Sequence, residues 1–74
     1  MMDRESFRIL ALQETRKKIR DLKEFNIPVI MKTIEQYQRA EVEDCFIEQQ
    51  QALLNKVYSR LRELEKKEQG LLRD

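Results

Sequence analysis

Apolar residues recur at alternating spacings of three and four along the C-terminal half of the chain. The repeat positions are Ile47, Gln50, Leu54, Val57, Leu61, Leu64, Glu68 and Leu71. All but Gln50 and Glu68 are apolar, which is typical of one face of an α-helix with coiled-coil-like packing. Three further residues widen this stripe, namely Phe46, Leu53 and Tyr58. The glutamine either fixes the packing register or marks the end of the packed region.

A second stripe of the same spacing lies upstream. Its members are Ile27, Ile30, Ile34 and Tyr37. It does not continue in phase into the first stripe, because acidic residues occupy the continuing positions. These are Glu41, Asp44 and Glu48. Such a phase change either alters the coiling locally or marks a bend.

The N-terminal third of the chain carries a third stripe of uneven density. Apolar residues are crowded from Phe7 to Leu12 and become sparse after Leu12. From this segment we expect Leu12, Ile19 and Leu22 to form the seam within the chain.

Proline and glycine give the predicted helix limits. Pro28 disfavours helical geometry in the residue before it but is tolerated in a first helical turn, and Asn26 is a good N-cap. Asp3 or Ser6 can cap the N-terminal helix, and Gly70 stands where a helix commonly ends. The sequence therefore predicts an all-α, two-helix hairpin. Its elements are a short helix at about 4–25, a corner at 26–28, a long helix at about 28–69 and a frayed tail at 70–74.

The alternative is a chain whose long helix is broken again around residues 40–44. No Gly, Pro or Asn marks such a break, but the apolar stripes change phase there. A continuous long helix would extend about 25–30 Å beyond the short one at 1.5 Å per residue. Its apolar stripe would then need another surface to cover it. We therefore expect the protein to be oligomeric.

Composition narrows the fold and the chemistry. The chain has 74 residues with one Gly, one Pro, one Cys and no His, which argues against a many-turned β fold, a disulfide scaffold and a His-based site. One small helical domain, residues 1–74, is expected, and a chain of this size commonly needs a partner for stability.

No phosphate-binding loop is present, and the carboxylates are spaced as helix-surface charges. We expect no enzymatic activity, no cofactor and no metal. Cys45 is expected to be a buried small hydrophobe.

Charge is divided into blocks along the chain. Five basic residues form one cluster with Asp21 as the single acid among them: Arg16, Lys17, Lys18, Arg20 and Lys23. Residues 41–48 carry a charge of −4. In a hairpin folded at residue 27 these blocks do not meet within one chain. They are either solvated helix faces, or they meet in an antiparallel dimer or face partners of opposite sign.

These patterns favour a non-enzymatic subunit that binds itself, as a dimer or higher oligomer, or a helical protein partner. The predicted partner-binding residues are Phe46, Ile47, Leu53, Leu54, Val57, Tyr58, Leu61 and Leu64. The overall form resembles small helical secretion chaperones and short subunits of tethering and scaffold complexes, a similarity of architecture alone. It implies a small chaperone, adaptor or assembly subunit that shields or scaffolds its partner.

The alternative function is a small helical regulator that binds nucleic acid through residues 16–23. A net charge of +1 and the lack of interleaved aromatic residues argue against nucleic acid as the partner. No apolar run reaches the roughly 18 residues needed to cross a bilayer, and the N-terminal residues are unlike a secretory signal. We therefore expect no membrane partner and a cytoplasmic location, consistent with one unpaired cysteine.

Overall fold

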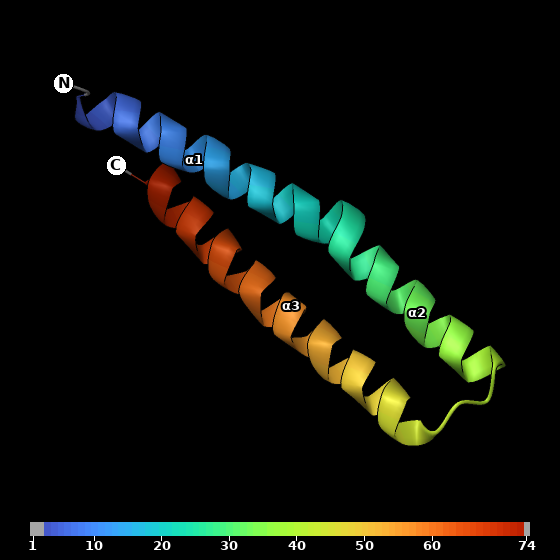
Figure 1. Cartoon of the computed structure of the whole chain (residues 1–74). Coiled ribbons are helices and arrows are strands. Elements are labelled where there is room, and N and C mark those ends of the chain that lie inside the picture. Colours follow the sequence, from blue (N-terminus) through green and yellow to red (C-terminus); the bar gives the residue numbers. More distant parts are fainter. Residues whose placement is uncertain (1–2, 74) are drawn as a thin grey trace.

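The chain folds into a helical hairpin with two long antiparallel arms (Figure 1). The computed structural model describes residues 3–73, and no strand occurs among them. The first arm consists of α1 (Arg4–Asp21), the π-helical turn η1 (Leu22–Asn26) and α2 (Ile27–Arg39). The second arm is α3 (Asp44–Leu72). The hairpin measures 56 × 17 × 15 Å, so it is a rod rather than a sphere.

The predicted all-α hairpin is confirmed, but the predicted corner at 26–28 is wrong. The chain reverses direction at residues 40–43, between α2 and α3. The alternative of a break around 40–44 located the bend correctly. The predicted lengths, a short helix at 4–25 and a long one at 28–69, are therefore wrong, and the first arm is the longer of the two.

A complete hydrogen-bonded cap ends α2 at this corner. The Val42 amide donates to the Tyr37 carbonyl at 3.3 Å, and the Glu41 amide donates to the Gln38 carbonyl at 3.3 Å. This is the Schellman pattern, which requires a left-handed residue after the helix. Glu41 supplies it with a φ of 53°. Glycine normally takes this position, so no residue type signals the turn here, and only the phase change of the stripes indicated it.

The helix passes through the predicted corner by means of η1. The Ile27 amide donates to the Leu22 carbonyl, five residues back instead of four, so one turn contains an extra residue. Asn26 has helical φ and ψ angles and its side chain caps nothing, contrary to the prediction. Pro28 lacks an amide hydrogen and therefore cannot make the bond to residue 24 that a regular helix needs. The wide turn absorbs this defect without ending the helix.

The extra residue brings the two upstream stripes onto one side of the first arm. Thr15, Ile19 and Leu22 precede the wide turn, and Ile27 and Ile30 follow it. Leu22 is half-buried and the other four are buried. At 100° per residue, an uninterrupted α-helix would move the second stripe off this side. The π turn therefore keeps both stripes facing α3.

The core lies midway along the rod, between the two arms. Ile19 and Ile27 of the first arm pack with Leu61 and Leu64 of α3. Leu22, Leu54 and Val57 are partly buried against them. Every position of the predicted C-terminal stripe from Ile47 to Leu71 is buried or half-buried. Packing thus extends past Gln50, which does not end it.

The helix ends differ in one respect from the prediction. Asp3 caps α1, accepting a hydrogen bond from the Ser6 amide at 2.7 Å, and this bond lowers the pKa of Asp3 below its usual value. The α3 helix continues through Gly70 to Leu72, so the predicted frayed tail is wrong for residues 70–72. Residue 74 of that tail lies outside the described residues. Gly70 lies within the helix and has no positive φ, so it does not form the predicted C-terminal cap.

Replacing Glu41 with Gly should stabilise the hairpin. Glycine reaches the left-handed region without the Cβ clash of glutamate, so Glu41→Gly should raise the free energy of unfolding by about 1 kcal/mol in urea titrations. Glu43→Gly removes the same charge from a residue with a φ of −56° and is the control. It should lower the stability, because glycine adds freedom to the unfolded chain. A loss of stability in Glu41→Gly would contradict this assignment of the turn.

The π turn can be tested by deleting one residue. Deletion of Glu24 in a Pro28→Ala background should convert η1 into a regular turn and leave both stripes facing α3, with no loss of stability relative to Pro28→Ala alone. Deletion of Lys17 in the same background is the control, because it rotates residues 4–16 by about 100° and takes Thr15 off the interface. It should lower the free energy of unfolding by about 1 kcal/mol or more. Equal losses from both deletions would show that η1 does not set the register.

Candidate protein-interaction surface

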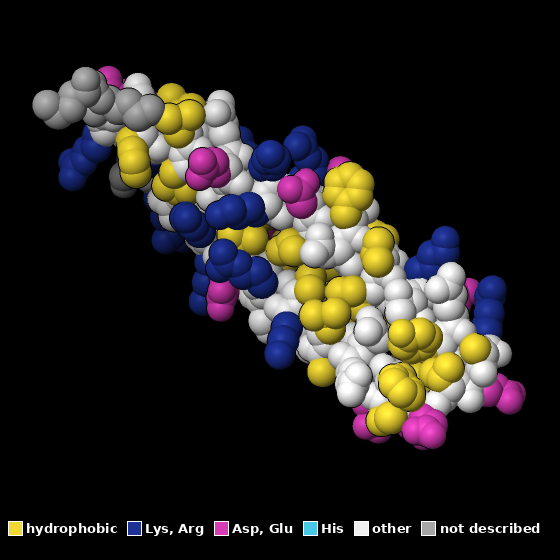
Figure 2. Space-filling model, in the orientation of Figure 1, with side chains coloured by type: hydrophobic (Ala, Val, Ile, Leu, Met, Phe, Trp, Pro, Cys, Tyr) yellow, Lys and Arg dark blue, Asp and Glu magenta, His cyan; other side chains and the backbone are white. Residues whose placement is uncertain are grey.

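An apolar groove runs beside the wide turn on one face of the rod. It is lined by Phe25, Asn26, Val29, Ile30, Leu53 and Val57, and we call this set the apolar groove. Phe25, Val29 and Leu53 are 61%, 62% and 44% exposed, whereas Ile30 is buried. The first three are therefore its walls, and Ile30 with half-buried Val57 forms its floor. On the face drawn in Figure 2, hydrophobic side chains gather between the middle of the rod and its turn end, and many basic side chains gather toward the N-terminal end.

Local geometry explains why these walls point outward. Phe25 and Val29 are four residues apart, so they lie on the same side of the helix. They are not members of the stripe that begins with Ile27, which faces α3. Leu53 directly precedes the stripe residue Leu54 and lies at the rim of the interface between the arms. The groove thus forms where apolar residues flank the core on both arms.

The groove is suited to a macromolecular partner more than to a small ligand. Its volume is about 350 Å³, but pockets that hold small molecules enclose most of the ligand surface. Here three walls are themselves largely exposed. None of its lining side chains is ionisable. The groove can therefore cover an apolar side chain or a helix face, and it offers no acid, base or nucleophile.

The predicted partner-binding residues divide into two groups. Leu61 and Leu64 are buried within the hairpin, and three others are half-buried. These three are Ile47, Leu54 and Val57. Phe46, Leu53 and Tyr58 are 48%, 44% and 39% exposed. The first arm, not a second molecule, covers most of the predicted stripe, because the corner lies at 40–43.

Sequence reasoning missed two of the groove walls, Phe25 and Val29. Their signal was the spacing of four between two apolar residues outside the stripe of Ile27 and Ile30. The interpretation of residues 26–28 as a corner concealed it, because a corner would have separated Phe25 and Val29 onto different helices.

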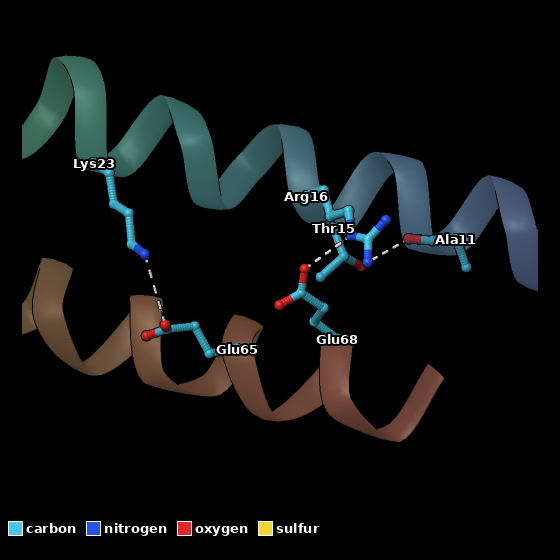
Figure 3. A network of polar contacts seen from close by, with 6 residues as sticks. All are labelled: Ala11, Thr15, Arg16, Lys23, Glu65 and Glu68. Atoms are coloured by element: carbon cyan, nitrogen blue, oxygen red, sulfur yellow. Dashed lines mark hydrogen bonds and ion pairs between the residues drawn. The ribbon is translucent and has the colours of Figure 1, made fainter. Parts of the chain in front are cut away.

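The basic segment 16–23 lies alongside α3. Arg16 Nε contacts Glu68 Oε2 at 2.9 Å, and Lys23 Nζ lies 3.8 Å from Glu65 Oε2 (Figure 3). Both cations are 54% exposed, so each pair contributes at most about 1 kcal/mol. These contacts exist because the chain folds at 40–43, which places the basic segment beside the acidic residues of α3.

The other basic side chains of this segment do not form a uniform cationic face. Lys17 and Lys18 share a surface hollow with Glu14 and Asp21. Arg20 is exposed. At 100° per residue, the five basic residues point in several directions around the helix. The structure therefore mixes carboxylates into the predicted anion-binding segment.

Cys45 lies in the first turn of α3 and is exposed, so the prediction that it is buried is wrong. Its Sγ is 3.7 Å from Glu43 Oε2. The stripe at this level consists of Tyr37 and Ile47, both half-buried, and Cys45 is not a member of it. Cys45 therefore lies at the acidic turn end of the rod and does not contribute to the core.

Comparison of the chain with protein-family models, curated proteins and solved structures gives no match. Within residues 3–73, no helix is both long and apolar enough to cross a membrane. The same residues contain no group of three or more His, Cys, Asp or Glu side chains placed to hold a metal ion.

The two sides of α2 should respond differently to truncation. Ile30→Ala removes a buried side chain and should lower the free energy of unfolding by about 2 kcal/mol or more in urea titrations. Met31→Ala is the control, because the side chain of Met31, the next residue, is 52% exposed. It should change the stability by less than about 0.5 kcal/mol. Equal effects of the two substitutions would contradict the placement of Ile30 in the floor of the groove.

Proposed function

We propose that this protein is a non-enzymatic helical interaction subunit, and that it binds another protein through the apolar groove. The observation that carries the proposal is the exposure of Phe25 and Val29, each more than 60% accessible, beside the exposed wall residue Leu53. Isolated apolar residues on a surface are ordinary, but a grouped set around a depression is typical of interaction sites. Partner binding would cover these walls.

The shape of the hairpin supports a partner with a helical binding segment. A groove between two helices accepts the apolar face of a third helix with anchors at spacings of three and four. Phe25 and Val29 have this spacing on the first arm, and the wall residue Leu53 and the floor residue Val57 have it on α3. The rigid arms would hold the walls in place, so that little conformational entropy is lost on binding.

The absence of ionisable groups from the groove supports a binding role over a catalytic one. General acid–base or nucleophilic catalysis needs such a group within reach of the bound molecule. The sequence contains no His, and the carboxylates of residues 14, 21, 65 and 68 lie outside the groove. Roles such as chaperone, adaptor or assembly subunit all fit this binding mode.

Nucleic-acid binding through Arg16, Lys17, Lys18, Arg20 and Lys23 is the alternative function. The ion pairs of Arg16 and Lys23 with α3 lessen its support, because these cations would have to exchange a carboxylate for a phosphate. Binding of that kind would weaken steeply with added salt, whereas apolar packing in the groove would not.

Site-directed photo-crosslinking tests the proposed function. A photoreactive phenylalanine analogue at position 25 should form protein adducts in cells that make the protein, because this side chain would contact the partner. The same analogue at Met31, on the same arm but outside the groove, should form far fewer. Mass spectrometry of the adducts identifies the protein attached.

The outcomes of this experiment separate the two functions. Adducts confined to position 25 support a groove that binds protein, whether the attached protein is another copy or a different chain. Equal labelling from positions 25 and 31 contradicts the proposal. Adducts formed with nucleic acid by an analogue at Lys17, without protein adducts at position 25, would establish the alternative.

A further inference from the structure

We propose that the partner in the apolar groove is a second copy of this chain, packed antiparallel across a two-fold axis through the groove. This inference rests on the proposed function and specifies its occupant. Three features of the same face support it. They are the position of the exposed Phe46, the position of a pocket that could hold its ring, and the distribution of charge.

One row of side chains on α3 connects these features. Phe46, Leu53 and Arg60 are spaced by seven residues, so they lie on one side of the helix. Leu53 is a wall of the groove. Arg60 lines a neighbouring pocket together with Lys18, Asp21, Leu22 and Leu64. The phenylalanine, the groove and the pocket therefore follow one another along one face of the rod.

The spacing along this face is nearly symmetrical about the groove. Along α3, Phe46 lies roughly 13 Å from the level midway between Leu53 and Val57, toward the turn. The level midway between Arg60 and Leu64 lies roughly 10 Å away in the opposite direction. A two-fold axis through the groove would thus bring Phe46 of each copy to within about 3 Å, along the rod, of the pocket on the other.

The pocket has the size and chemistry that a phenyl ring requires. It is an open depression of about 200 Å³, so it has room for one face of a phenyl ring, whose other face the second copy would cover. Leu64 is buried and Leu22 half-buried, which gives the pocket an apolar floor. Lys18 and Arg60 supply cations that can interact with the face of an aromatic ring. Phe46 is 48% exposed and thus available for insertion.

Charge is complementary in the same antiparallel register. The acidic residues 41–48 carry −4 at the turn end of the rod. An axis through the groove places Asp44 at about the level of Lys18 and Lys67 of the second copy, because they lie at similar distances from the axis. A parallel arrangement would place the two acidic turns together and oppose association. Charge therefore favours the orientation that the phenylalanine and its pocket also require.

The area of such an interface is sufficient for a specific dimer. The rod is 17 Å wide, and the antiparallel overlap is about 37 Å long at 1.5 Å per residue. This gives roughly 600 Å² on each copy, or about 1,200 Å² in total, the lower end of the range for specific interfaces. The contact is isologous, so the same groove and the same pocket are used on both copies and assembly stops at two.

Sedimentation equilibrium of the full chain tests the stoichiometry. The expected mass is twice the 9.0 kDa of one chain. Val29→Glu should give a single-chain mass at the same concentration, because it places two carboxylates near the axis. Met31→Glu adds the same charge about 200° around the helix and should remain dimeric. Circular dichroism should show unchanged helix content in both variants, since both side chains are more than half exposed.

The native cysteine tests the orientation. A spin label on exposed Cys45 lies about 15 Å from the axis along the rod, so two labels in an antiparallel dimer should be separated by about 30–40 Å. A parallel dimer would bring the labels to within about 20 Å of each other.

Phe46→Ala should weaken the dimer at least tenfold if this ring occupies the pocket of the second copy.

A single-chain mass at all concentrations overturns this inference. So does a short distance between the labels, or a dimer that Val29→Glu leaves intact. The proposed function fails separately: it is contradicted only if position 25 shows no preference over position 31 in photo-crosslinking. A single-chain mass combined with adducts between position 25 and a different protein would therefore retain the function and reject the second copy.

Discussion

The hairpin depends on a single five-residue step in the backbone, the bond from the Ile27 amide to the Leu22 carbonyl. It allows one helical arm to present Ile19 and Ile27 to the same pair of leucines, Leu61 and Leu64. Without the extra residue, one of the two stripes would rotate away from α3. The same step keeps the chain helical where Pro28 would otherwise interrupt it. A local irregularity thus preserves regular packing over the whole length of the rod.

Burial of the main stripe leaves a secondary apolar surface beside the π turn. A small rod has a high ratio of surface to volume, and its few buried side chains cannot cover every apolar residue. Phe25 and Val29 consequently remain exposed on one side of the first arm. Polar side chains at these positions would have served a monomer equally well. In the proposed function, a protein partner would cover Phe25 and Val29.

The electrostatic contacts have a secondary role in the fold. The Arg16–Glu68 and Lys23–Glu65 pairs join the two arms at exposed positions, where solvent and salt weaken them (Figure 3). Charge is also separated along the rod, acidic at the turn and basic beyond the groove. In the proposed dimer, this separation would oppose a parallel neighbour and favour an antiparallel one.

The sequence by itself determined the helical class and the face of α3 that becomes buried, because 3-4 spacing is a local property of the chain. It narrowed the first cap to Asp3 or Ser6, and the structure decided for Asp3. It did not locate the corner. Pro28 is a strong local signal, yet tertiary packing retained the helix there, since burying Ile27 and Ile30 against α3 outweighs one lost backbone hydrogen bond. Glu41 carries no local turn signal, yet the chain reverses there. Which side chains remain exposed followed from that reversal, so only the tertiary structure could identify Phe25 and Val29 as a surface.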